Sequence, residues 1–174
     1  VNPPFMNGRF SRTSRSPAIN KSGTLYWPFW LAHGAGALEK AGHSVRFIDC
    51  PATGTGEDEL MAALAEERPE LVVMDTSTPS IYSDLRVGSM VRKRLPEAFV
   101  VMVGTHVSAL PRLCLGLAPS LDAVAVGEYD ATLVELADTL EDGGDVRSVP
   151  GLLLNFRGEL VETGERDMIE DLDS

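Results

Sequence analysis

An α/β fold with a doubly wound, mostly parallel five-stranded sheet is predicted by three features of this 174-residue sequence. Short apolar runs without an alternating polar face are typical of strands that helices bury on both sides. Segments with the 3.6-residue helical period lie between these runs. Strand and helix alternate along the chain, which predicts parallel strands joined by right-handed crossovers.

The strands are predicted from Val- and Ile-rich runs bounded by turn residues. The first strand is represented only by Val1, expected to be its last residue, so the sequence is expected to begin late in that strand. The other four predicted strands are Val45–Ile48, Leu71–Met74, Phe99–Val103 and Ala123–Val126.

Five helices are predicted between and after these strands. Gly42 is expected to end the first helix in a left-handed conformation, and Ser83 to cap the third. The second helix has three acidic residues in its first turn, where they suit the positive end of the helix dipole. The helices are marked by the apolar stripes of 27–41, 60–64 and 87–91, by the short segment Pro111–Leu117, and by 133–140 before Gly143-Gly144.

The last part of the chain differs from this pattern. Two short apolar runs flank Asn155-Phe156-Arg157-Gly158, which predicts a β-hairpin over Gly151–Thr163. The acidic tail Glu165–Ser174 is expected to be a linker. We therefore predict an α/β cofactor domain over residues 1–148, followed by the hairpin and linker over 149–174.

Composition excludes several functions. A formal net charge of −11 argues against nucleic acid as a partner. Two cysteines without a CxxC pair argue against a disulfide framework or an iron–sulfur cluster held by this chain alone, and suit the cytoplasm. No apolar run approaches the ~18 residues of a membrane span, and no signal peptide is visible.

Small and polar residues follow the predicted strands at their carboxyl ends, where open α/β sheets bind ligands. Such loops let a large flat ligand approach the backbone, although short connections favour the same residues without any ligand. The loops are Asn2-Pro3-Pro4, Asp49–Gly56, Asp75–Ser80, Gly104–Ser108 and Gly127–Asp130.

The loops carry no nucleotide-binding or catalytic signature. Nothing after Val1 fits G-x-G-x-x-G, Gly54-Thr55-Gly56 lacks a third glycine, and no Walker A sequence occurs. His106 is the one histidine in a strand-end loop, and no catalytic triad or metal-spaced histidine pair is present. We expect neither a catalytic residue nor a metal ligand in this chain.

The segment Asn2–Tyr26 is basic in an acidic protein. It contains Arg9, Arg12, Arg15 and Lys21 but no Asp, Glu or His. It could contact an anionic group or an acidic partner surface, or it could be a solvated loop.

The ordered strand-end loops carry a family resemblance over nearly the whole chain. They are Asn2-Pro3-Pro4, Thr76-Ser77-Thr78-Pro79-Ser80, Val103-Gly104-Thr105-His106 and Gly127-Glu128-Tyr129-Asp130. In this order they resemble the N-terminal cobalamin-binding domain of cobalamin-dependent radical SAM enzymes, a flavodoxin-like or Rossmann-like fold. The family's Gly-Gly-x-His is represented by Gly104-Thr105-His106, without the second glycine.

This resemblance implies cobalamin as the cofactor. The residues it places around the cofactor are Asn2, Pro3, Thr76, Ser77, Ser80, Gly104, Thr105, His106, Ser108, Gly127 and Glu128. Because the first loop has no Asp-x-His-x-x-Gly, we expect no histidine of that loop to bind cobalt from below. The lower face would be open, bound to water, or shielded by a residue of Asn2–Tyr26.

The resemblance also implies a parent enzyme, often a methyltransferase. Its radical SAM domain, in the same chain, would hold S-adenosylmethionine and a 4Fe–4S cluster, and the present fragment would catalyse nothing alone. Two alternatives stay open: a flavodoxin-like interaction or regulatory domain without a cofactor, and a glycosyltransferase-like nucleotide-sugar domain.

Overall fold

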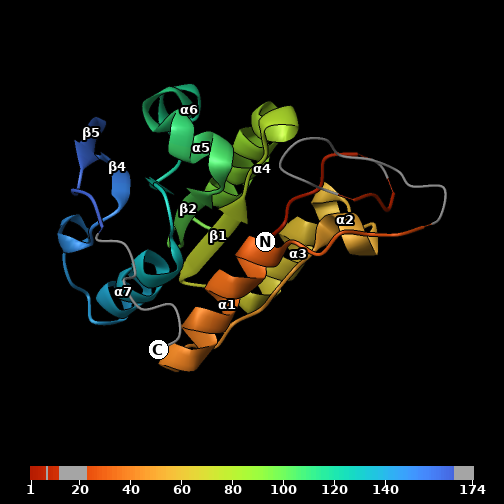
Figure 1. Ribbon diagram of the computed structural model, residues 1–174, viewed down its shortest axis with the longest axis horizontal. Coiled ribbons are helices and arrows are strands. Elements are labelled where there is room, and N and C mark those ends of the chain that lie inside the picture. The colour runs from red at the N-terminus through yellow and green to blue at the C-terminus, as the bar shows by residue number, and fades with distance from the viewer. Residues whose placement is uncertain (7, 12–22, 167–174) are drawn as a thin grey trace.

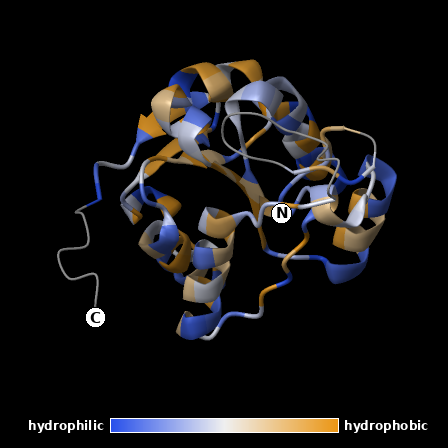
Figure 2. Cartoon of the chain, turned by 45° about the vertical axis from the view of Figure 1, so that its right-hand side comes forward, coloured by the Kyte–Doolittle hydropathy of each residue, from blue (hydrophilic) through white to orange (hydrophobic). Residues whose placement is uncertain are grey.

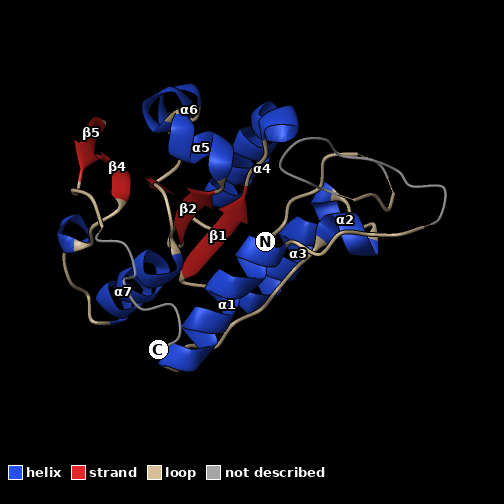
Figure 3. Cartoon of the chain, viewed as in Figure 1, coloured by secondary structure: helices blue, strands red, loops and turns tan. Residues whose placement is uncertain are grey.

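Five strands form one mixed sheet in the computed structural model, which describes residues 1–6, 8–11 and 23–166. The strands lie side by side in sequence order (Figure 3). β1, β2 and β3 are parallel to one another, β4 is antiparallel to β3, and β5 is antiparallel to β4. They are β1 Leu71–Asp75, β2 Phe99–Val103, β3 Ala123–Ala125, β4 Leu152–Phe156 and β5 Glu159–Glu162. The predicted α/β fold class is therefore confirmed.

The amino end of the chain continues the sheet beyond β1. The amine of Val1 donates to the carbonyl of Val73 over 2.7 Å, and its carbonyl accepts from the amide of Asp75 over 2.9 Å. On its other side, the amide of Asn2 donates to the carbonyl of Ile48 over 2.8 Å, within an isolated parallel bridge to Asp49. Val1 thus occupies the end of a strand position between β1 and the segment 45–49.

The predicted strand Val45–Ile48 was wrong, because the segment forms no strand in the structure. A strand needs a partner along its length, and this segment is paired only at its end, through Asn2. The five strands observed are therefore not the five predicted, since the hairpin supplies two of them.

Helices cover both faces of the sheet (Figure 1). They are α1 Phe29–Ala41, α2 Cys50–Thr53, α3 Glu57–Glu67, α4 Ile81–Arg94, α5 Thr105–Ala109, α6 Pro111–Leu117 and α7 Asp130–Glu141, with 3₁₀ turns η1 Thr78–Ser80 and η2 Val146–Ser148. Within the described part of the chain, no helix is long and apolar enough to cross a membrane.

The helix ends follow the local sequence. Gly42 ends α1 at φ 105° and donates its amide to the last turn, as predicted. Glu59 accepts the amide of Gly56 over 2.9 Å and so stabilises the start of α3. The predicted cap at Ser83 was wrong: η1 leads directly into α4, which therefore begins at Ile81.

Two apolar clusters separate the three layers of the molecule. On one face, α3, α4, α5 and α6 pack on the sheet through residues such as Leu60, Val87 and Leu115. On the other face, α1 and α7 pack through Leu31 and Leu136. Figure 2 shows these helices with hydrophobic and hydrophilic residues interleaved along their ribbons. The loops that follow β1, β2 and β3 all start at the same edge of the sheet, because these strands are parallel.

The predicted hairpin is confirmed as β4 and β5, and it also extends the sheet. Arg157 at φ 54° and Gly158 at φ 86° form its two-residue turn. β4 pairs antiparallel with β3, and an ion pair of 2.7 Å joins Arg112 to Glu162.

Candidate functional site

Four chain segments meet in one row at the carboxyl edge of β1–β3. The amide of Thr76 donates to the carbonyl of Val103 over 2.9 Å, which joins the loops after β1 and β2. The amide of Gly127 donates to the hydroxyl of Ser108 over 3.1 Å, which joins the loops after β2 and β3. With Val1 bonded to Asp75, the row is continuous from Asn2 to Glu128, so the structure brings all the predicted site residues to one edge.

The hydroxyl groups in the loop after β1 form hydrogen bonds within the protein. Thr76, Ser77 and Ser80 are buried, and the Thr76 hydroxyl donates to the carbonyl of Val103 over 2.7 Å. The Ser77 and Ser80 hydroxyls bond to each other over 2.6 Å. These three residues therefore fix the shape of the loop from within.

Asp84 is the centre of this buried network, and sequence reasoning missed it. Its carboxylate accepts from the amide of Ser77 over 3.2 Å and from the hydroxyl of Ser80 over 2.8 Å. Its side chain is buried on α4. The available signal was the helical period: an acidic residue that shares a stripe with Val87 and Val91 is expected to be buried and partnered.

Gly104 allows the loops after β1 and β2 to approach closely. Its φ is 116°, and a Cβ atom at this position would lie 2.6 Å from the Thr76 carbonyl oxygen. Any side chain here would strain the backbone and separate the two loops. The glycine predicted from the sequence thus positions the residues that follow it.

The accessible part of the edge comes from the loops after β2 and β3. Thr105, Gly127 and Glu128 are exposed, whereas Gly104, His106 and Ser108 are half-buried. Nδ1 of His106 lies 3.2 Å from the hydroxyl of Thr78, so the histidine bridges to the loop after β1. These groups offer hydrogen bonds to a ligand that covers the edge.

Two buried polar atoms near the edge have no hydrogen-bond partner among the described residues. They are Oδ1 of Asn2 and the hydroxyl of Tyr129. The amide nitrogen of Asn2 is engaged, since it donates to Asp49 over 2.9 Å. Unpaired buried polar atoms are rare and costly, so a polar ligand at this edge fits the structure.

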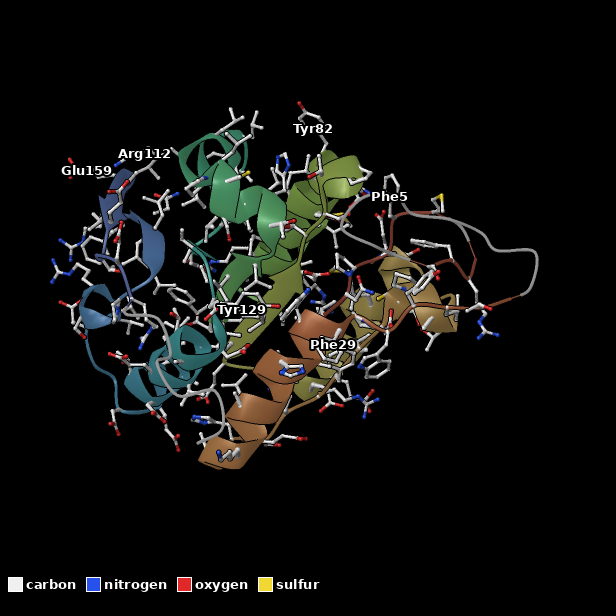
Figure 4. All side chains as sticks on the ribbon, viewed as in Figure 1. Phe5, Phe29, Tyr82, Arg112, Tyr129 and Glu159 are labelled. Atoms are coloured by element: carbon white, nitrogen blue, oxygen red, sulfur yellow. The ribbon has the colours of Figure 1, made fainter. Side chains whose placement is uncertain are left out.

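Burial and nearby carboxylates disfavour ionisation in this region. Burial raises the pKa of the Tyr129 phenol above its ordinary value, and the charges of Asp75 and Asp130 raise it further. Burial is also the main cause that raises the pKa of Asp130. The charge of His33 acts in the opposite direction, and the charge of Glu128 raises this pKa further. A neutral Tyr129 can donate a hydrogen bond. Figure 4 labels this residue, which directly precedes α7.

The basic segment is described only in part. Arg12, Arg15 and Lys21 lie outside the described residues. The guanidinium of Arg9 donates to the carbonyl of Ala52 over 2.7 Å, and therefore holds its loop against α2.

A metal site is not formed by this chain's own side chains in the described ranges. Across 1–6, 8–11 and 23–166, no three His, Cys, Asp or Glu residues gather to hold an ion. Cys50 and Cys114 are buried, and the two form no disulfide with each other.

The sequence is similar to known proteins over most of its length. A family model described as "B12 binding domain" matches residues 15–137. An anaerobic magnesium-protoporphyrin IX monomethyl ester cyclase of Cereibacter sphaeroides is 32% identical over 84% of this chain and 25% of its own length. An uncharacterized methyltransferase of Pyrococcus horikoshii is 28% identical over 87% of this chain and 33% of its own. The chain thus spans a quarter to a third of these relatives.

Solved structures share the fold. The radical S-adenosylmethionine methyltransferase TsrM from Kitasatospora setae, with cobalamin and a 4Fe–4S cluster bound, superposes with a TM-score of 0.69 at 23% identity, over 84% of this chain and 28% of TsrM. The cobalamin-dependent S-adenosylmethionine radical enzyme OxsB, with aqua-cobalamin and S-adenosylmethionine bound, gives 0.67 at 16% identity, over 82% of this chain and 20% of OxsB.

Proposed function

The chain belongs to the B12-binding domain family, and we propose that it holds cobalamin at the carboxyl edge of β1–β3. The observation that carries this proposal is the continuous row of loops at that edge, with two buried polar atoms that no described residue satisfies. A large planar cofactor with polar side groups covers such an edge and supplies the missing hydrogen bonds.

The residues at the edge divide into two roles in this proposal. Those that contact the cofactor are the accessible ones and the two with unpaired atoms: Gly104, Thr105, His106, Ser108, Gly127, Glu128, Asn2 and Tyr129. Pro3 belongs to the same edge. Thr76, Ser77 and Ser80 act from behind, because their hydroxyls hold the loop after β1 in shape. Cobalamin itself supplies a cobalt centre that carries and transfers a methyl group.

We propose that the cofactor domain ends at residue 148. Residues 1–148 contain every residue that we assign to the cofactor. Residues 149–174 include the hairpin, which extends the sheet through β4, and then the linker to a further domain.

The further domain that we propose is a radical SAM domain in the same longer chain. Relatives named as cyclases and methyltransferases are three to four times as long as the matched part, as their coverage of 25% and 33% implies. S-adenosylmethionine and the 4Fe–4S cluster belong to that domain, because two buried cysteines here cannot supply the thiolates of a cluster. The acidic charge and the low number of cysteines favour a cytoplasmic protein with no nucleic-acid or membrane partner.

Absorbance after incubation with hydroxocobalamin and desalting tests the cofactor assignment. We expect the protein to retain corrin absorption bands. Thr105→Trp places a bulky ring on the accessible edge and is expected to weaken binding by at least ~10-fold, or about 1.4 kcal/mol. Ala62→Trp, on the exposed side of α3, is the matched control and should bind as the wild type does. A folded wild-type protein that elutes colourless contradicts the proposal and favours a domain without cofactor.

A further inference from the structure

Asn2 and Tyr129 carry the two unpaired polar atoms of the cofactor edge, and both residues are almost completely buried. Asn2 is 2% exposed and Tyr129 is 7% exposed. Oδ1 of Asn2 and the hydroxyl of Tyr129 have no hydrogen-bond partner within residues 1–6, 8–11 and 23–166. Such atoms are costly inside a folded protein, so each indicates a polar group that is supplied from outside.

Both residues lie around the carboxyl end of β1. The amide of Asp75, the last residue of β1, donates over 2.9 Å to the carbonyl of Val1, which directly precedes Asn2. The charge of Asp75 also acts on Tyr129. The Tyr129 ring packs closely on α1, because its Cε2 atom lies 3.1 Å from the point where Gly34 would carry a Cβ atom (Figure 4). The two unpaired atoms therefore belong to the same part of the edge.

The two atoms have opposite hydrogen-bonding roles. The amide nitrogen of Asn2 donates to Oδ1 of Asp49 over 2.9 Å, and an ionised carboxylate can only accept, so the unpaired Oδ1 of Asn2 is an acceptor. The Tyr129 hydroxyl keeps its proton at neutral pH and remains a donor, because burial and the charges of Asp75 and Asp130 raise its pKa. A ligand group that satisfies both atoms must therefore donate to Asn2 and accept from Tyr129.

A primary carboxamide meets this requirement, since it has both N–H donors and a carbonyl acceptor. An ionised carboxylate accepts from Tyr129 but cannot donate to Asn2. It would also lie near the negative charges of Asp49 and Asp75. An ammonium group donates but cannot accept. The rim of the corrin ring in cobalamin carries primary carboxamides on slender side arms, which can insert at an edge where the flat ring itself cannot.

We propose that Asn2 and Tyr129 bind one carboxamide arm of the corrin ring and select it against a carboxylate at the same position. This inference rests on the proposed function, and it adds a specificity that the binding of a large planar cofactor does not require. A carboxylate arm leaves Oδ1 of Asn2 buried and unpaired, so the affinity is expected to fall by at least ~10-fold. An amidation reaction at this arm must therefore precede loading of the cofactor onto this chain.

Absorbance titration with a series of corrinoids tests this inference. The probes are hydroxocobalamin and its isomeric monocarboxylates, in which each primary carboxamide is replaced in turn. We expect one isomer to bind at least ~10-fold more weakly than the other isomers, because only one arm meets Asn2 and Tyr129. All isomers carry the same charge, so long-range repulsion from a protein with a net charge of −11 weakens them alike.

Two variants separate the two hydrogen bonds. Asn2→Ala removes the acceptor and keeps the backbone, so the preference against the weak isomer is expected to shrink by at least ~3-fold. Tyr129→Phe removes a donor that the carboxamide and the carboxylate both use, so both affinities fall and the preference remains. Asn155→Ala removes a side-chain bond to Pro119 on the hairpin side and is the matched control, which should leave all affinities unchanged.

Two outcomes overturn this proposal alone. Equal affinities for all the monocarboxylates mean that no arm is recognised by a matched donor and acceptor. A weak isomer whose preference is unchanged in Asn2→Ala means that other residues recognise the arm. A wild-type protein that fails to bind hydroxocobalamin itself contradicts the proposed function and this inference together, so the two kinds of failure are distinguishable.

Discussion

The carbonyl oxygen of Thr76 lies 2.6 Å from the point where Gly104 would carry a Cβ atom. Real Cβ atoms do not approach a backbone oxygen this closely, so the contact between the loops after β1 and β2 depends on the absence of a side chain. The same glycine has φ 116°, which other residues avoid.

Gly104→Ala is therefore expected to destabilise the fold. Positive-φ strain and overpacking together cost about 2–4 kcal/mol, and cobalamin binding is expected to weaken because the two loops separate. Urea unfolding measures the first effect and absorbance titration the second. Gly36→Ala, in the open middle of α1, is the control and is expected to stabilise by about 0.5–1 kcal/mol. Equal stability of the two variants would contradict this reasoning.

Asp84→Asn tests the buried network behind the loop after β1. The carboxylate accepts from the Ser77 amide and the Ser80 hydroxyl, and hydrogen bonds to a charged acceptor contribute about 1.5–3 kcal/mol. We expect a loss of about 2 kcal/mol in the free energy of unfolding. Glu66→Gln, an exposed change on α3, should be neutral within about 0.5 kcal/mol. An equally harmless Asp84→Asn would mean that the network carries no stability.

Tyr129 is expected to make stability pH-dependent at the alkaline end. Its pKa is raised in the folded protein, so the folded chain retains a proton that the unfolded chain loses above pH 10.0. The contribution of Tyr129 to the free energy of unfolding is complete below pH 10.0 and decreases as the pH rises above this value. Between about pH 8 and about pH 11, the wild type should lose roughly 1 kcal/mol more than Tyr129→Phe, or roughly 2–4 °C in melting temperature.

The control for this comparison is Tyr82→Phe, because Tyr82 is 77% exposed and labelled at the surface in Figure 4. Over the same pH interval, the Tyr82→Phe variant should lose as much stability as the wild type. The assignment to Tyr129 fails if Tyr129→Phe follows the wild-type curve.

Ser108→Ala tests the link between the loops after β2 and β3. The Ser108 hydroxyl accepts the amide of Gly127 and so holds the loop after β3 in place. Loss of this bond is expected to cost about 1 kcal/mol in the free energy of unfolding. Because the loop after β3 is then less well held, the cobalamin dissociation constant is expected to rise roughly 5-fold. Ser89→Ala, which removes a hydroxyl bonded within α4, should leave cobalamin affinity unchanged. Unchanged affinity in Ser108→Ala would remove the loop after β3 from the site.

The cobalt centre is expected to lack a protein imidazole on its lower face. The first loop contains no histidine, and His106 is engaged with Thr78. The electron paramagnetic resonance spectrum of the Co(II) form is therefore expected to show no nitrogen superhyperfine coupling from a histidine. Such coupling, if lost in His106→Ala, would identify His106 as the ligand and contradict the expectation.

Elements marked by local sequence signals could be predicted with good precision. Phe99–Val103 and Pro111–Leu117 have the predicted bounds, because an apolar run between turn residues and a proline at a helix start are local signals. The segment Val45–Ile48 is also rich in apolar residues but forms no strand, since pairing depends on a neighbour that composition does not report. The attachment of the hairpin to β3 is likewise a non-local property.

At the candidate site, loop positions were predictable and side-chain roles were not. Thr76, Ser77 and Ser80 were expected to meet the cofactor, and the structure buries their hydroxyls in internal bonds. Whether a hydroxyl faces a ligand or its own backbone depends on the local turn, here η1 and the buried carboxylate of Asp84. The unpaired hydroxyl of Tyr129 could be recognised only once its surroundings were known.

The hairpin at the far side of the sheet has a consequence for self-association. An outermost strand exposes a row of free amides and carbonyls, which invites neighbouring molecules to polymerise through added strands. β5 is short, and both its first and last residues are exposed glutamates. Glu162 is paired with Arg112, whereas the charge of Glu159 repels the same strand of an approaching copy and so disfavours association through this edge.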